Sequence, residues 1–322
     1  MILLILPHTS KVTANDVTTK GDLNKELNVA NKLMAEEKYE EAYQELIKYA
    51  EYNQLAQFNL GVMALNGWGG EANHPSACEW FEKSAQEDIP MAQELLGNCY
   101  RDGIHKNASF DMAKKWYLRA VDNGLPTSYC NLGKIYFEGK LVKKNQRKGI
   151  RFCEQAGEAG SIQTQLFLAK NFDIGGIFKQ DLSRTLYWYN VAASANNTEA
   201  QYQFARILFN NNADNKGHNM AVKAAESAAI KGYQPAYILT AKLYINAPLD
   251  SNTQLPTSDN LAKAYMWAQA TLRQDIETKD KIDIKEMLNK IRTVMPKTWE
   301  EDLNGEVDDH FERLSSANAI MK

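Results

Sequence analysis

A single spacing of 36 residues orders most of this 322-residue chain. Two adjacent positions recur at that spacing, occupied by Leu60-Gly61, Leu96-Gly97, Leu132-Gly133, Leu168-Ala169, Phe204-Ala205 and Thr240-Ala241. A chain of this length exceeds the size at which one compact core keeps growing, so two globular domains or a repeating array are expected. The fixed period favours the array, because each repeat of such a fold packs on its neighbours.

The columns around this pair predict the first helix of each repeat, which we call helix A. Small residues lie four positions before the Leu column, at Ala56, Ala92, Ser128, Thr164, Ala200 and Ala236. Large residues lie four positions after it, at Tyr100, Tyr136, Phe172, Leu208 and Tyr244. This spacing places all three columns on one helix face. Helix A is expected to end in a left-handed residue at Gly67, Gly103, Gly139, Gly175 and, in the fifth repeat, Asn211.

A second helix, helix B, is predicted to follow in each repeat. Residues that favour N-caps lie six positions after the closing column, at Asn73, Ser109, Asn145, Asp181 and Gly217. An aromatic column follows at Trp80, Trp116, Phe152 and Trp188, and glycines close the helix at Gly124, Gly160 and Gly232. The predicted fold class is therefore all-α, a right-handed α-solenoid of stacked antiparallel helix pairs.

The order of these columns resembles the Sel-1-like repeat, a relative of the tetratricopeptide repeat. The pattern is small-x-x-x-Leu-Gly, an aromatic residue and Gly over residues 92–103, then Ala-x-x-Trp-Tyr-x-x-Ala over residues 113–120. The expected organisation is a flexible terminus or signal-peptide remnant at 1–20, a tetratricopeptide-like hairpin at 21–53, about six Sel-1-like repeats at 54–275 with a loop insertion at 248–260, and capping helices at 276–322.

The motifs of an enzyme are not found in the sequence. The glycines at 67–70 and 175–176 lack the Lys-Ser/Thr of a phosphate loop, and the five histidines are scattered, as expected for surface loops. The pair Asp308-Asp309 is typical of a solvated helix start. We therefore predict no catalytic residues, no metal site and no cofactor.

Composition limits the partners. A formal net charge of -3 gives no general attraction to phosphate backbones, so no nucleic-acid partner is predicted. The chain contains no apolar run of about 18 residues, so no transmembrane segment is predicted.

Four cysteines form two candidate pairs. Cys78, early in a helix B, and Cys99, late in the next helix A, lie at ends that antiparallel stacking brings together. Cys130 and Cys153 could also meet, although their registers fit less well. The alternative is four reduced, buried cysteines. Two bridges would suit an oxidising compartment, and the resemblance adds that some exported bacterial Sel-1-like proteins are cysteine-bridged.

The N-terminus leaves the compartment open. The apolar residues 1–6, followed by Val12-Thr13-Ala14, resemble the end of a secretory signal, but they are fewer than usual and no positive charge precedes them. The alternative is a short strand or frayed terminus. Both a periplasmic or exported location and a cytoplasmic one are therefore kept.

Helix A positions outside the packing columns are candidates for partner binding, because solenoid curvature usually places these helices on a concave surface. One such column reads Val62, Asn98, Lys134, Lys170, Arg206 and Lys242. Its last four members predict a basic stripe and a protein partner with an acidic surface. Flanking positions would add further contacts, at Asn131, Phe137, Phe167, Asp173, Gln203 and Phe209. The alternative is that Lys and Arg are merely good helix formers on a solvated face.

The resemblance implies a non-catalytic scaffold or adaptor that binds another protein. A narrower reading from the same family is a periplasmic immunity protein that neutralises a secreted lipase-type effector. An enzyme acting on cell-wall fragments is the competing class.

Overall fold

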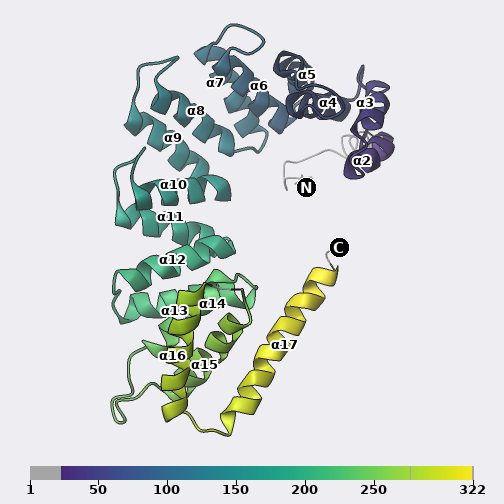
Figure 1. Ribbon diagram of the computed structural model, residues 1–322. Coiled ribbons are helices and arrows are strands. Elements are labelled where there is room, and N and C mark those ends of the chain that lie inside the picture. The colour runs from purple at the N-terminus through teal and green to yellow at the C-terminus, as the bar shows by residue number, and fades with distance from the viewer. Residues whose placement is uncertain (1–22, 276, 321–322) are drawn as a thin grey trace, which may run out of the picture. The chain divides into compact units, whose positions relative to one another are not determined.

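The computed structural model describes residues 23–275 and 277–320, and within these ranges it contains helices and no strands (Figure 1). The helices are α2 (Asn28–Ala35), α3 (Tyr39–Ile47), α4 (Gln54–Asn66), α5 (His74–Gln86), α6 (Pro90–Asp102), α7 (Phe110–Asp122), α8 (Thr127–Glu138), α9 (Gln146–Glu158), α10 (Ile162–Ile174), α11 (Leu182–Ser194), α12 (Thr198–Asn210), α13 (Asn215–Ile230), α14 (Pro235–Ile245), α15 (Ser258–Leu272), α16 (Thr278–Val294) and α17 (Trp299–Ile320). The predicted all-α fold of stacked antiparallel helix pairs is confirmed. In the described residues, no helix is long and apolar enough to cross a membrane.

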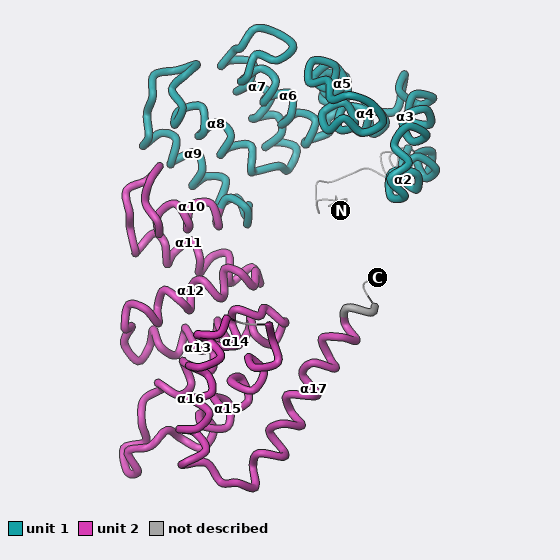
Figure 2. The backbone as a smooth tube through the Cα atoms, viewed as in Figure 1, with its two compact units in different colours: residues 1–164 teal, residues 165–322 magenta. Residues whose placement is uncertain are grey.

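The chain divides into two compact units, residues 1–164 and 165–322, as Figure 2 shows. Unit 1 contains the packed pairs α2–α3, α4–α5, α6–α7 and α8–α9. Unit 2 contains α11, the pairs α12–α13 and α14–α15, and two further helices, α16 and α17, that both pack on α15. The segment predicted at 1–20 lies outside the described residues, and the other predicted domain boundaries stay predictions.

Local sequence determines where most helices begin and end. The side chains of Asn73, Ser109, Asn145 and Asp181 each accept a hydrogen bond from the backbone N–H three residues later, as predicted for N-caps. Gly67, Gly103, Gly139 and Gly175 have φ between 67° and 82°, the left-handed conformation predicted for the end of helix A.

The fifth repeat departs from both predictions. Asn211 is not left-handed, with φ of −96°, and Asn212 takes that conformation one residue later. Gly217 does not cap helix B, because it lies inside the longer helix α13 and its N–H donates to Asp214 Oδ1 at 2.8 Å. Asp214 begins the helix earlier, since its carboxylate can satisfy a backbone amide that a glycine has no side chain to reach.

The glycine of the Leu-Gly pair controls how closely the two helices of a repeat approach. A Cβ atom added at Gly61 would lie 2.5 Å from the ring of Phe81, and one at Gly97 would lie 2.6 Å from that of Tyr117. In the third repeat, a Cβ at Gly133 would lie 2.5 Å from the carbonyl oxygen of Gly149 on α9. Each glycine therefore leaves the space that helix B fills.

The C-terminal helices cover the last repeat in unit 2. Ile284 and Ile291 of α16 and Val307 of α17 are buried in the same cluster as Trp267 of α15. His310 of α17 is also buried, and its Nε2 atom lies 3.0 Å from the hydroxyl of Tyr237. The expectation that the histidines lie in surface loops is therefore wrong for His310, because α17 packs it against the last repeat. It is also wrong for His218, which is half-buried inside α13.

The pair Asp308-Asp309 also lies elsewhere than expected. These residues are in the middle of α17 and not at a helix start. They are exposed, and Asp308 lies 2.5 Å from Arg273 Nη1.

Replacing Gly133 tests the close contact between α8 and α9. Gly133→Ala should lower the free energy of unfolding by about 1–3 kcal/mol, because the added Cβ collides with the backbone of Gly149. Gly305→Ala on α17 is the matched control, since a Cβ there meets no atom within 4 Å and alanine favours the helix by up to about 1 kcal/mol. Thermal and urea unfolding of both variants would show opposite shifts. Equal shifts would contradict the proposed role of the glycine.

Burial of His310 should make stability depend on pH. Burial, and secondarily the charge of Arg313, lower the pKa of His310 from its ordinary value of 6.5. As pH falls below 6.5, the unfolded chain takes up a proton that the folded chain resists, so stability should fall. The loss of melting temperature between pH 7.5 and pH 5 should therefore be smaller in His310→Gln than in the unmodified chain. His74→Gln, at an exposed site, is the control, and an unchanged pH dependence in His310→Gln would refute the assignment.

Candidate functional site

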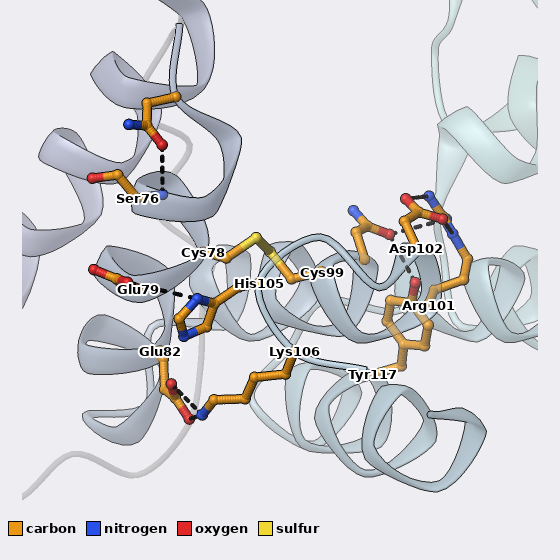
Figure 3. Close-up of a disulfide and its surroundings, with 12 residues drawn as sticks. Ser76, Cys78, Glu79, Glu82, Cys99, Arg101, Asp102, His105, Lys106 and Tyr117 are labelled. Carbon is orange, nitrogen blue, oxygen red and sulfur yellow. Dashed lines mark hydrogen bonds and ion pairs between the residues drawn. A yellow bond between two sulfur atoms is a disulfide. The ribbon is translucent and has the colours of Figure 1, made fainter. Parts of the chain in front are cut away.

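Both candidate cysteine pairs are disulfide bonds, and the described residues contain no free cysteine. Cys78 of α5 is bonded to Cys99 of α6, with their Cα atoms 6.0 Å apart (Figure 3). This bridge joins helix B of one repeat to helix A of the next. It therefore fixes the stacking between two repeats.

An ion pair and a histidine–carboxylate contact lie beside the Cys78–Cys99 bridge, as Figure 3 shows. Both come from the loop between α6 and α7 and reach back to α5. His105 Nδ1 lies 3.6 Å from Glu79, and Lys106 Nζ lies 2.5 Å from Glu82. Exposed pairs of this kind contribute about 0–1 kcal/mol each, so the disulfide is the stronger connection.

The second bridge joins the two helices of one repeat. Cys130 of α8 is bonded to Cys153 of α9, and their Cα atoms are only 4.0 Å apart. The cysteine registers alone fitted this pairing less well. Gly133 and Gly149 explain it, because their missing side chains let α8 and α9 come this close.

The alternative of four reduced cysteines is wrong, because all four form disulfide bonds. Two disulfides suggest an oxidising location outside the cytoplasm, because such bonds rarely persist in reducing compartments.

In unit 1, the candidate partner-binding residues are only partly free to meet a ligand. Asn98 Oδ1 accepts hydrogen bonds from the hydroxyl of Tyr117 at 2.7 Å and from Arg101 at 3.1 Å. Lys134 is exposed and donates to Asn131, which is buried, at 2.9 Å. Phe137 is half-buried. In unit 1, Lys134 is therefore the most accessible member of the predicted set.

In unit 2, the same helix face contains an ion pair that crosses from one repeat to the next. Arg206 of α12 donates to Asp173 of α10 at 3.1 Å and to Gln203 of its own helix at 2.7 Å. The side chains of Arg206 and Asp173 are only 35% and 28% exposed. Burial raises the pKa of the neighbouring Tyr189 to about 12, with Asp173 acting in the same direction and Arg206 against it. The charge of Arg206 is thus compensated within the protein.

The other members in unit 2 differ in accessibility. Lys170 is exposed, whereas Lys242 is half-buried. Phe167 is half-buried, with its ring 5.8 Å from that of Phe178 in an edge-to-face contact. Phe209 is half-buried against the cluster of α12, α13 and α14. The two phenylalanines therefore contribute mainly to packing, and the lysines contribute most of the uncompensated charge.

One surface residue on this face was missed from the sequence. Ile174 is 70% exposed and lies one helical turn after Lys170 on α10. The equivalent residues of the other repeats are all polar: Asn66, Asp102, Glu138, Asn210 and Asn246. A single apolar residue in a polar column was the available signal. Ile174 therefore presents an apolar side chain next to the exposed Lys170 on this helix.

Unit 2 also contains a cavity of about 460 Å³ between α13, α15 and α17. Trp267 and His310 form part of its wall, and Glu226, Glu306 and Asp309 supply carboxylates. The indole N–H of Trp267 has no hydrogen-bond partner within the described part of the chain. No group of three His, Cys, Asp or Glu side chains placed to hold a metal ion occurs among these residues. The cavity thus presents three carboxylates, the His310 ring and the indole N–H of Trp267.

Antiparallel helix pairs stacked at a 36-residue period define a helical-repeat protein of the tetratricopeptide type. Within that class, the chain contains Sel1 repeats. The Sel1 repeat matches residues 54–88, 90–125, 126–161 and 163–197. The resemblance inferred from the sequence is therefore confirmed.

Two curated relatives match parts of the chain. The uncharacterized protein NMB1327 of Neisseria meningitidis is 27% identical over 153 residues, which cover 48% of this chain and 31% of that protein. A putative sel1-like repeat-containing protein, L21 of Acanthamoeba polyphaga mimivirus, is 36% identical over 88 residues, covering 27% and 15%. The chain thus spans less than a third of the length of these relatives.

Solved structures with the same kind of fold are similar at low identity. A Sel1 repeat protein from Oxalobacter formigenes has a TM-score of 0.46 and 22% identity, covering 77% of this chain and 99% of that one. The protective antigen c5321 of uropathogenic Escherichia coli has a TM-score of 0.43 and 18% identity, and the match covers 87% of this chain and 65% of that one. The immunity protein Pa5087 of Pseudomonas aeruginosa has a TM-score of 0.40 and 18% identity, and the match covers 67% of this chain and 82% of that one.

Removing either disulfide should destabilise unit 1 without changing the helix pattern. Replacing Cys78 and Cys99 together by Ala should lower the free energy of unfolding by about 3 kcal/mol, as expected for loss of a link across 21 residues. The paired replacement of Cys130 and Cys153 should cost about as much. Thermal unfolding and hydrogen exchange measure both effects, and reduction of the unmodified protein should reproduce them. Four thiols titrating in denaturant before any reductant is added would refute both bridges.

Proposed function

We propose that this protein is a non-catalytic scaffold that binds another protein through the exposed faces of its A helices. Sel1 repeats suggest protein binding, and the exposed residues of α10 supply the observation that carries the proposal. Lys170 and Ile174, one turn apart, offer a positive charge and an apolar side chain that the packing of unit 2 does not use. That combination suits a partner with acidic and apolar surface groups.

The compensated ion pair refines the predicted basic stripe. Arg206 already has a counter-ion in Asp173, so it should attract an acidic partner less than an unpaired lysine does. Lys170 and Lys242 then supply the uncompensated charge in unit 2, and Lys134 supplies it in unit 1. We also propose that this face lies on a concave surface.

The two disulfides support a periplasmic or exported location for this binding. A narrower form of the proposal is an immunity role, in which the partner is a secreted lipase-type effector. The identity of the captured partner separates this role from that of an adaptor. An enzyme acting on cell-wall fragments would instead show turnover by the purified protein, and that turnover should be lost when one residue of the unit 2 cavity is replaced.

Charge reversal at Lys170 and Lys242 tests the binding surface. Lys170→Glu with Lys242→Glu should reduce recovery of the specific partner at least tenfold in affinity capture from the source cell, because two favourable charges become repulsive. The control is Lys216→Glu with Lys223→Glu, which reverses two exposed lysines on α13. Quantitative mass spectrometry compares the three baits, and direct binding with the purified partner follows. Equal recovery by both variants would exclude this surface.

A further inference from the structure

A dense group of positive charges lies on unit 1, where the chain passes from α8 to α9. The loop between α8 and α9 and the first two turns of α9 contain Lys140, Lys143, Lys144, Arg147, Lys148 and Arg151. We call this group the basic segment. All six side chains are exposed, whereas the whole protein has a formal net charge of -3. The segment therefore has a charge opposite to that of the molecule.

The protein itself compensates little of this charge. Lys140 has a carboxylate 3.8 Å away, at Glu138, and the ammonium of Lys148 lies 4.5 Å from the centre of the Tyr136 ring. Across residues 23–275 and 277–320, Lys143, Lys144, Arg147 and Arg151 form no ion pair. This arrangement differs from that of Arg206, whose counter-ion lies within the same unit.

The position of the segment adds an electrostatic cost. Arg147 and Lys148 lie in the first turn of α9, where the helix dipole favours negative groups and disfavours cations. That turn contains no acidic residue, and its N-cap is the neutral Asn145. Repulsion among the neighbouring lysines acts in the same direction. A bound anionic surface would relieve both effects.

The loop nevertheless stays attached to the repeat. Leu141 and Val142, which separate the first lysine from the next two, are half-buried and pack against the cluster that contains Tyr100, Trp116 and Ile135. The cations are therefore held on an ordered part of unit 1, with their side chains directed to solvent.

We propose that the basic segment attaches the protein to an anionic lipid surface. A protein-binding surface usually combines charge with exposed aromatic or apolar side chains, as Lys170 and Ile174 do on α10, whereas the six exposed residues of the basic segment are all cations. An anionic bilayer needs only several basic side chains close to its surface, each contributing about the same amount. Four of the six are lysines, which act as flexible point charges without the fixed geometry of a bidentate contact. The attachment leaves the A-helix face free for the proposed partner and does not depend on it.

The test uses the full-length oxidised protein and vesicles of phosphatidylglycerol mixed with phosphatidylcholine. The protein should sediment with these vesicles at low salt, release as salt rises, and ignore pure phosphatidylcholine. The triple variant Lys143→Glu, Lys144→Glu, Arg147→Glu should bind at least about a hundredfold more weakly, since each basic residue near the surface contributes about a factor of five.

The matched control reverses three exposed lysines of α16, Lys279→Glu, Lys285→Glu and Lys290→Glu, and lowers the net charge by the same amount. It should bind vesicles as the unmodified protein does, and both variants should keep their helical circular dichroism. Equal weakening in the two variants would show a net-charge effect and overturn the proposal. Binding to polyglutamate without binding to vesicles would also overturn it, because the segment would then recognise an acidic polypeptide.

Discussion

The contact of helix B with the Leu-Gly column of helix A is the constraint on which the rest of the structure depends. Gly61 and Gly97 each accept an aromatic ring, while Gly133 accepts the backbone of Gly149. Unit 2 reaches a comparable contact with small residues on both sides, since Ala205 shares a buried cluster with Ala221 and Ala225. The pair Ala224-Ala225, which replaces the usual aromatic residues, is thus compatible with an alanine where earlier repeats have glycine.

The two units hold their stacked helix pairs together in different ways. Unit 1 contains both disulfides, one between repeats and one where two glycines let the helices approach closely. Unit 2 has no cysteine and ends instead in α16 and α17, which bury the apolar face of α15. His310 and Tyr237 add a polar contact within that buried cluster. Covalent links and a terminal cap thus perform the same task, which is to hold stacked pairs together.

Local features could be predicted from the sequence, and long-range packing only where the period determines it. Glycine conformation and N-caps depend on a few adjacent residues, so within the repeats these predictions were wrong only for the fifth, which has a longer helix B. The contact between Arg206 and Asp173 spans 33 residues, one period less one helical turn, so the register could have predicted it. Burial of His310 depends on how α17 packs, and no repeat precedes it from which that packing could be inferred. The close approach of Gly133 to Gly149 also depends on how α8 and α9 pack, so the sequence alone could not explain the bridge between Cys130 and Cys153.

The residues that the packing does not require are the best guide to function. Ile174 is apolar in a column that is polar in the other five repeats. Because its side chain is 70% exposed, it buries little apolar surface. The basic segment likewise adds repulsion to the start of α9, where a neutral or acidic turn would be more stable. Neither Ile174 nor the cations of the basic segment belong to the buried clusters of the repeats. The two proposed interactions therefore involve different surfaces, since one is partly apolar and the other is purely cationic.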